Sequence, residues 1–203
     1  MPYPATTTSN KPEFPRWRGT LVLVACIAIS IIALRYWIPE HEDIPPPEPP
    51  PPEPRTLEQT PLTDLLGMWV TNRDGEMTPV NDLAGGLIGI YFSAQWNPAC
   101  RFFTNHLLAF YDQMQQQGKP FEVVLVSWDR SENDLFIYMR DYEMPWKAIS
   151  WQAPQRMQLA RTFNIHRIPE LIIVNDQGHP LSRDGRNAIM NHPERAYRQW
   201  SLQ

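Results

Sequence analysis

The stretch 96–100 contains the residues of this chain whose types and spacing could support thiol chemistry. Its sequence is Trp-Asn-Pro-Ala-Cys, so that Cys100 lies three residues after Asn97. A thiol at a helix N-terminus can become a nucleophile, because backbone N–H groups and the helix dipole stabilise its thiolate. Disulfide exchange requires one thiolate that attacks and a second thiol that releases the mixed disulfide. Redox-active cysteines often occur as a C-x-x-C pair, and the residue three positions before Cys100 is Asn97, so this stretch offers only one thiol.

The residues on either side predict where this stretch lies. The apolar run 87–93, LIGIYFS, is typical of a buried strand. Apolar residues then recur at three- and four-residue steps from Cys100 to Met114, which predicts a helix. Gly118 is expected just after that helix, and Pro120 prevents the helix from resuming. The sequence therefore places residues 96–100 in a tight turn that leads from a strand into a helix.

Asn97 and Cys100 also have purely structural interpretations. Asn is among the preferred N-cap residues, and Pro98 would then occupy the first helical position, where proline is favoured. Cysteine is among the most buried residue types, so Cys100 can be an inert thiol of the core. The alternatives, an active amide at Asn97 and a reactive thiol at Cys100, stay open at this point.

Residues 61–203 predict an α/β domain in which helices flank a mixed sheet. The expected elements are a helix after Thr60, a hairpin over 68–80 that turns at 72–75, strands over 87–93, 121–127, 170–174 and 179–182, and helices over 98–117, 132–142, 154–163 and 193–200.

The residues before this domain predict a membrane anchor and a tether. Residues 1–18 are polar and are expected to be disordered. Residues 19–38 are apolar except for a few positions, with Arg35 as their single charge, and about 20 such residues cross a bilayer core. Residues 39–60 form a linker in which eight of the ten residues from 45 to 54 are proline. Such a run adopts polyproline II and acts as a semi-rigid spacer.

Charge on either side of residues 19–38 predicts their orientation. Three basic residues lie between 11 and 18, whereas three acidic residues lie between 40 and 43. The positive-inside rule therefore places the N-terminus in the cytosol and the domain on the lumenal, periplasmic or extracellular side. A cleaved signal peptide is the alternative to an anchor, and an SH3 or WW ligand is the alternative to a spacer.

Composition argues against several other classes of protein. The net charge is −4 and no basic patch stands out, so we expect no nucleic-acid partner. Two cysteines, Cys26 and Cys100, cannot form a disulfide scaffold. The five histidines lack metal-ligand spacing, so we expect no metal and no cofactor.

Further motifs resemble those of the tryparedoxin and nucleoredoxin branch of the thioredoxin superfamily. They cover nearly all of residues 63–186 and are YFSA at 91–94, FEVV at 121–124, SWDR at 127–130, MPW at 144–146, IP at 168–169, DQG at 176–178 and RDGR at 183–186. The resemblance implies a thioredoxin fold and dithiol–disulfide exchange on protein substrates. It also implies that Pro169 is cis and faces the active-site cysteine pair, where adjacent backbone groups can pair with a substrate strand.

The chain differs from this family at two positions. The family motif is W-C-P-P-C, so Asn97 replaces the nucleophile, and Cys100 matches the resolving cysteine deeper in the helix. Burial of Cys100 should raise its pKa. Glu170 stands where family members usually have Thr, and a carboxylate there would further disfavour a thiolate. Glu170 would also favour basic partner segments through charge complementarity.

Three functions are compatible with these observations. The favoured one is a membrane-tethered thioredoxin-like module that has lost dithiol exchange and binds protein or peptide segments at the former active-site groove. The second is an oxidoreductase that uses the single thiol of Cys100, and the third is a scaffold that acts through its tether. The expected groove residues are Trp96, Pro98, Ile168, Pro169 and Glu170.

Overall fold

The computed structural model describes residues 58–203. The predictions for the tail, for the span at 19–38 and for most of the linker at 39–60 lie outside the described residues. Within residues 58–203, no helix has both the length and the apolar character that crossing a bilayer requires.

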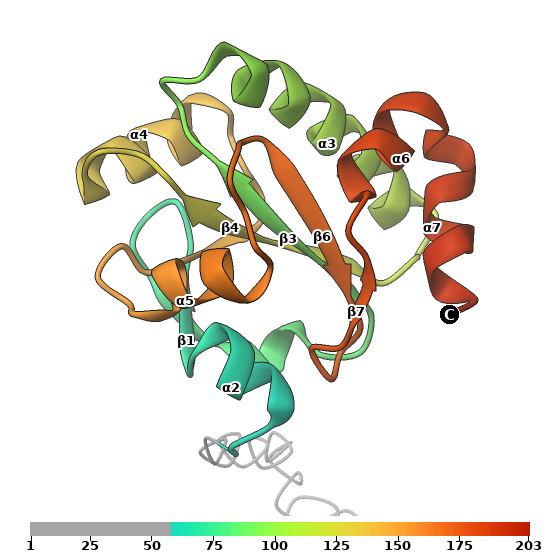
Figure 1. Cartoon of the computed structure of the whole chain (residues 1–203), viewed down its shortest axis with the longest axis horizontal. Helices are drawn as coiled ribbons and strands as arrows, with labels where there is room; N and C mark the ends of the chain where they lie inside the picture. Colours follow the sequence, from blue (N-terminus) through green and yellow to red (C-terminus); the bar gives the residue numbers. More distant parts are fainter. Residues whose placement is uncertain (1–57) are drawn as a thin grey trace, which may run out of the picture. The chain divides into compact units, whose positions relative to one another are not determined.

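In the part of the chain that the structure describes, a seven-stranded mixed sheet has the strand order β2-β1-β5-β4-β3-β6-β7 (Figure 1). The parallel strands β3, β4 and β5 form its centre, while β1 and β6 run antiparallel to their neighbours. The strands are β1 (Trp69–Thr71), β2 (Met77–Pro79), β3 (Leu87–Ser93), β4 (Phe121–Ser127), β5 (Lys147–Ile149), β6 (Glu170–Val174) and β7 (Pro180–Ser182).

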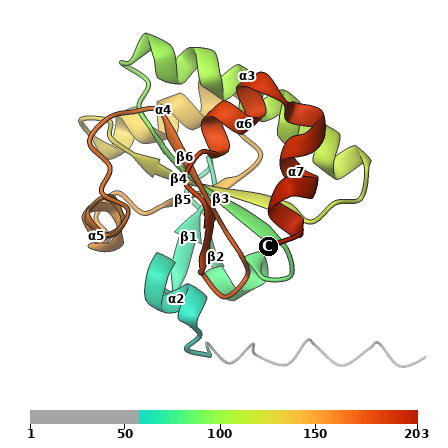
Figure 2. The ribbon, with the colours of Figure 1, turned by 45° about the vertical axis from the view of Figure 1, so that its right-hand side comes forward.

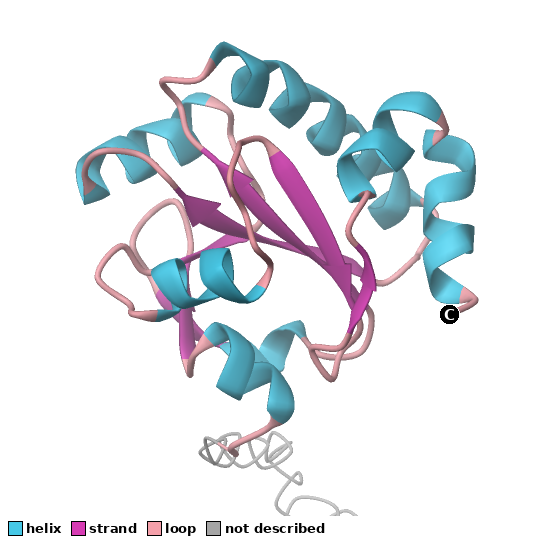
Figure 3. Cartoon of the chain, in the orientation of Figure 1, coloured by secondary structure: helices cyan, strands magenta, loops and turns pink. Residues whose placement is uncertain are grey.

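Helices cover both faces of this sheet (Figures 2 and 3). They are α2 (Pro61–Leu66), the short 3-10 helix η1 (Val80–Leu83), α3 (Pro98–Gln116), α4 (Glu132–Asp141), α5 (Gln155–Thr162), α6 (Gly185–Asn191) and α7 (Pro193–Ser201). Alternate residues of β3 enter two separate cores. Tyr91 packs with side chains of α3, α4, α6 and α7, whereas Ile90 and Phe92 pack with α2 and α5. The predicted mixed sheet between helices is confirmed.

Local sequence signals set the ends of several elements as predicted. The Asn97 side chain caps α3, and Ser131 caps α4 by accepting a hydrogen bond from the Asp134 amide at 3.1 Å. Gly118 and Asn164, with φ of 62° and 53°, follow α3 and α5 in the left-handed conformation that ends a helix. The strands at 87–93, 121–127 and 170–174 have the predicted bounds.

The sequence prediction missed β5, η1 and α6. The strand β5 has three residues and exists because it pairs with β4 on one side and β1 on the other. No side-chain hydrogen bond caps α6, so the usual start signal is absent. Gly185 begins α6 against β6, where a Cβ atom would come within 2.7 Å of the Leu171 carbonyl oxygen. Tertiary packing therefore places both β5 and α6.

Candidate functional site

Asn97 joins the start of α3 to the loop before β6. Its side-chain oxygen accepts hydrogen bonds from the amides of Ala99 at 2.9 Å and Cys100 at 3.4 Å. Its side-chain nitrogen donates to the Ile168 carbonyl oxygen at 3.3 Å. The N-cap role with Pro98 at the first helical position is confirmed. The bond to Ile168 was not predicted, because it links residues 71 positions apart.

The Ile168–Pro169 peptide bond is cis, as the family resemblance implied. Pro169 is buried, and Ile168 and Glu170 on either side of it are half-buried. Asn97 therefore bonds to a backbone carbonyl directly before the cis-proline. That carbonyl is one of the groups through which a strand could pair with this loop.

Trp96 and Pro98 form the exposed side of the turn. Half of Trp96, 51%, is accessible to solvent. The indole is nevertheless held in place, because its Nε1 donates a hydrogen bond to the Trp128 carbonyl oxygen at 3.1 Å. An aromatic ring fixed in this way offers a large apolar contact with little loss of side-chain entropy on binding.

Cys100 lies beneath this turn and is fully buried, with 0% exposure. Burial raises the pKa of the Cys100 thiol, and the charge of Asp129 acts in the same direction. Hydrogen bonds from Ser93 and from the Ala94 backbone, together with the positive charge of Arg186, partly oppose this rise in pKa. The predicted direction of the pKa shift is confirmed, and the thiol form is favoured at neutral pH.

Glu170 does not act on Cys100 in the way that the sequence predicted. Its Oε1 accepts a hydrogen bond from Arg167 Nε at 2.8 Å, so the carboxylate forms an ion pair. The carboxylate that disfavours the Cys100 thiolate is Asp129 instead. The physical reason is orientation, since Glu170 turns toward the loop that carries Arg167.

A cluster of four buried hydroxyl groups supports the backbone of Cys100. The Cys100 carbonyl oxygen accepts hydrogen bonds from Thr104 Oγ1 at 2.9 Å and from the Tyr91 hydroxyl at 3.2 Å. Ser93 donates to Tyr91 at 2.8 Å, and the Tyr138 hydroxyl lies 2.9 Å from Ser93 and 2.6 Å from Thr104. Burial raises the pKa of Tyr138 to about 12. The cluster thus stays neutral and ties α3 to β3 and α4.

Asp129 fixes the backbone that enters the motif. One carboxylate oxygen accepts a hydrogen bond from the Gln95 amide at 2.7 Å, and the other accepts from the Ser127 hydroxyl at 2.8 Å. Asp129 is only 4% exposed, and burial raises its pKa. Asp129 belongs to the SWDR motif at 127–130, but it was not predicted as a site residue. The available signals were that motif and its place two residues after a buried strand.

One polar hollow lies beside the turn, and a second lies beside the residues on either side of the cis peptide bond. One, of about 490 Å³, lies beside Trp96 and includes Arg101, Asp129 and Arg130. The other, of about 370 Å³, lies beside the cis-proline and includes Arg167, Glu170, Arg183 and Arg186. We call the second one the cis-proline hollow. Among the described residues, no group of three or more His, Cys, Asp or Glu side chains is arranged to hold a metal ion.

Comparison with known proteins places this geometry among thioredoxin-like proteins. The model of a family described as thioredoxin-like matches residues 85–179. Nucleoredoxin of Danio rerio is 36% identical over 135 residues, which are 66% of this chain and 32% of the relative. The chain therefore spans about a third of the length of that relative.

Solved tryparedoxin structures also match this chain, and each match covers most of the length of the solved chain. Tryparedoxin II from C. fasciculata is 32% identical with a TM-score of 0.61, and the match covers 66% of this chain and 91% of that chain. Tryparedoxin from Trypanosoma brucei is 34% identical with a TM-score of 0.61, over 67% of this chain and 94% of that chain.

Proposed function

We propose that the former active site of this chain binds protein segments without exchanging dithiols. The chain belongs to the tryparedoxin and nucleoredoxin branch of the thioredoxin-like superfamily. The observation that carries this proposal is the position of Asn97. Its side chain caps α3 and bonds to Ile168, where a family member would present an attacking thiolate. An amide cannot attack a disulfide, so the first step of exchange has no nucleophile.

The environment of Cys100 supports the loss of exchange. The thiol is fully buried and its pKa is raised, which reduces both access and the thiolate population at neutral pH. Cys100 is also the only cysteine among the described residues. A mixed disulfide at Cys100 would therefore have no second thiol in the domain to release it.

The backbone beside Pro169 supports binding of an extended partner segment. The Ile168 carbonyl oxygen already accepts from Asn97, but a carbonyl oxygen has two lone pairs and can accept again. A partner strand could thus pair with the loop while its side chains contact Trp96, Pro98 and the surroundings of Glu170. This arrangement requires no reaction at Cys100.

Membrane attachment is part of the same proposal and rests on the sequence. Residues 19–38 would anchor the chain, and the proline-rich part of residues 39–60 would hold the domain away from the bilayer. The charge difference across the span would place the domain on the extracytosolic side.

A second function is supported by the groups around the Cys100 thiol. The hydrogen bonds from Ser93 and Ala94 and the charge of Arg186 all favour a thiolate. In this alternative, the Cys100 thiolate attacks a substrate disulfide, forms a mixed disulfide and releases one substrate thiolate. The chain would then be an oxidoreductase that depends on an external thiol for release.

These two functions can be distinguished by comparing how two variants capture partners from the native membrane. We expect Trp96→Ala to weaken capture by roughly thirtyfold, since loss of a central aromatic anchor often costs about 2 kcal/mol. Cys100→Ser should leave capture unchanged, and reductant should release nothing. Thermal melting of both full-length variants controls for folding. If Cys100→Ser abolishes capture and reductant releases the wild-type partner, the thiol function replaces the binding function.

A further inference from the structure

One stretch of the domain has an unusual charge distribution for a chain whose net charge is −4. No Asp or Glu occurs between Glu143 and Glu170, whereas Lys147, Arg156, Arg161 and Arg167 all lie in this interval. These residues form β5, α5 and the loop that leads to β6. Negative charge is therefore confined to other parts of the domain.

A hollow of about 360 Å³ is lined mainly by residues of this stretch, and we call it the α5 hollow. It is lined by Trp128, Met157, Ala160, Arg161, Asn164, Ile165 and His166, and none of these residues is acidic. Met157 is 53% exposed, which is high for a large apolar side chain. The α5 hollow thus combines an apolar surface with a cationic edge.

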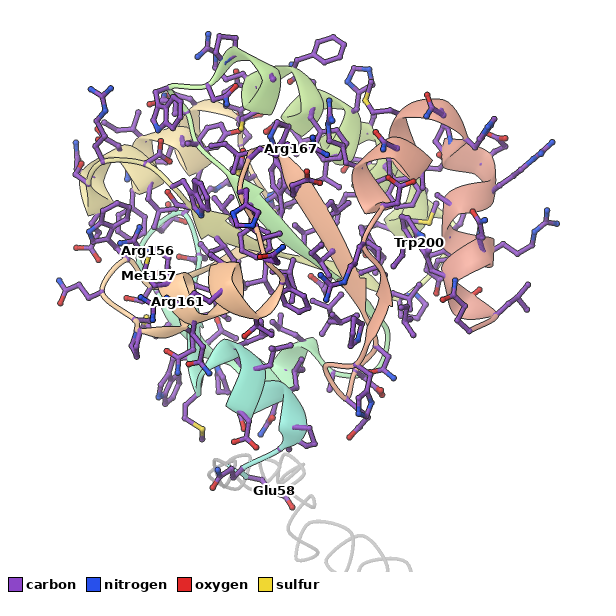
Figure 4. The ribbon with its side chains drawn as sticks, in the orientation of Figure 1. Glu58, Arg156, Met157, Arg161, Arg167 and Trp200 are labelled. Atoms are coloured by element: carbon purple, nitrogen blue, oxygen red, sulfur yellow. The ribbon has the colours of Figure 1, made fainter. Side chains whose placement is uncertain are left out.

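Arg156, Met157 and Arg161 lie close together on α5, whereas Arg167 lies nearer the start of β6 (Figure 4). Arg156 is held rigidly, because its guanidinium stacks on Trp151 at 3.9 Å and donates to the carbonyl oxygens of Trp151 and Ser127. Arg161 is exposed at the next turn of α5. Arg161 is therefore the cation that an incoming anion can reach with the least rearrangement.

The α5 hollow adjoins the cis-proline hollow. It shares Asn164, Ile165 and His166 with the cis-proline hollow. On its other side, Trp128 lines the α5 hollow and accepts the hydrogen bond from Trp96. A segment bound beside Pro169 would reach the α5 hollow with its next residues.

Glu170 offsets Arg167, but it leaves Arg161 without an acidic neighbour in the lining of the α5 hollow. Its ion pair with Arg167 joins a side chain that is 20% exposed to one that is 86% exposed. The ion pair with Arg167 compensates the negative charge of Glu170, and a preference for basic partner segments would depend on that charge. The expectation from sequence that Glu170 selects basic partners stays a prediction, and a basic segment would have to displace Arg167 from this carboxylate.

We propose that the α5 hollow receives an apolar side chain of an acidic polypeptide segment, whose carboxylates pair with Arg161. This inference rests on the proposed function, because the α5 hollow adjoins the cis-proline hollow. Charge complementarity selects the acidic segment, and the apolar lining selects the side chain between its carboxylates. A concave hollow of this volume accommodates a side chain, whereas a bilayer surface is too flat to enter it.

Peptide binding to the full-length chain, in non-ionic detergent, tests this directly by fluorescence anisotropy. The probes are a labelled peptide with a central Leu between Asp and Glu residues, the same peptide with Lys at each acidic position, and the acidic peptide with Gly replacing Leu. We expect the acidic Leu peptide to bind at least about tenfold more tightly than either of the others. Higher salt should weaken this binding.

Two matched charge reversals locate the site. Arg161→Glu should reduce binding of the acidic peptide by at least about tenfold, whereas Arg198→Glu, at an exposed position of α7 across the sheet, should leave it unchanged. Met157→Ser should reduce binding and lessen the advantage of Leu over Gly. Both replaced arginines are exposed, and a thermal melt of each variant confirms that it folds.

Other outcomes would overturn this inference. These are equal binding of the acidic and Lys peptides, equal effects of Arg161→Glu and Arg198→Glu, or binding of anionic phosphatidylserine vesicles that depends on Arg161 in the absence of peptide binding. The proposed function fails separately, if Trp96→Ala leaves capture of native partners unchanged. Capture that depends on Trp96 without any charge preference would remove only the acidic-segment inference.

Discussion

Asn97 performs two structural tasks at the scale of a single residue. It caps α3, a role that typically contributes about 1 kcal/mol, and it bonds to the carbonyl oxygen before the cis-proline. A cysteine at this position has no side-chain amide, so it could perform neither task in this way. The replacement of the nucleophile thus comes with a new contact across the site, rather than with a simple loss of a thiol.

Restoring a thiol at this position tests whether the remaining machinery is intact. The wild-type chain should reduce insulin disulfides no faster than the dithiothreitol background. Asn97→Cys should raise the rate clearly above that background, because the helix start and the resolving position are already in place. Asn97→Ser, which keeps a capping oxygen but adds no thiol, is the matched control. Turnover by the wild type would refute the proposed loss of exchange.

The pKa of Cys100 gives a second prediction for a single residue. Because burial raises this pKa, the thiol should react with iodoacetamide slowly near pH 7, and its rate should rise only above the ordinary thiol range near 8.5. The folded state also holds this proton more tightly than the unfolded state, so stability decreases as pH rises above the unfolded pKa. A Cys26→Ser background, labelled with and without denaturant, provides the measurement. Rapid labelling of the folded chain at neutral pH would favour the thiol function.

At the scale of elements, the buried hydroxyl cluster explains how α3 keeps its position over the sheet. Tyr91 and Ser93 come from β3, Thr104 from α3 and Tyr138 from α4. Their hydrogen bonds satisfy polar groups that would be costly to bury alone. The cluster therefore joins three elements directly below the motif.

Removing one hydroxyl group should show how much the cluster contributes to the stability of the domain. Tyr138→Phe deletes the partner of both Ser93 and Thr104, and we expect it to lower the free energy of unfolding by about 1–2 kcal/mol. Tyr142→Phe, at the half-buried end of the same helix, should lower the free energy of unfolding much less, because water can reach this position and take the place of the lost hydroxyl group. Urea denaturation of the two variants is the comparison. Equal losses would mean that the cluster contributes nothing specific to the position of α3.

At the scale of the whole molecule, the domain that carries the proposed binding site follows residues 19–60, whose sequence predicts an anchor and a spacer. A spacer of this kind would keep the groove accessible to partners near a membrane. In the proposed orientation, the groove would meet partners in an extracytosolic compartment, where disulfides persist. Binding without exchange would then leave the disulfides of a partner intact.

Protease accessibility checks this orientation. A protease added to intact cells or spheroplasts should digest the domain at residues 58–203 and spare an epitope tag placed before residue 18. Digestion of both parts after addition of detergent shows that each can be cleaved. Protection of the domain in intact cells, with loss of the tag, would reverse the proposed topology.

The sequence by itself determined the features that depend on neighbouring residues. Apolar runs gave the strands at 87–93 and 121–127, and the side chains of Asn97 and Ser131 marked the starts of α3 and α4. These features are local, since a cap or an apolar period acts over a few positions of the chain. The replacement of the first motif cysteine by Asn97 could be seen for the same reason, because the motif spans only residues 96–100.

The tertiary structure alone decided which distant groups meet at the site. It joined Asn97 to Ile168 and Gln95 to Asp129, and it turned Glu170 toward Arg167. It also gave β5 its place, because the pairing of these three residues with β4 and β1, rather than a local sequence pattern, defines the strand. Side-chain direction and pairing across the sheet depend on the packed core, and no local pattern of residues encodes them.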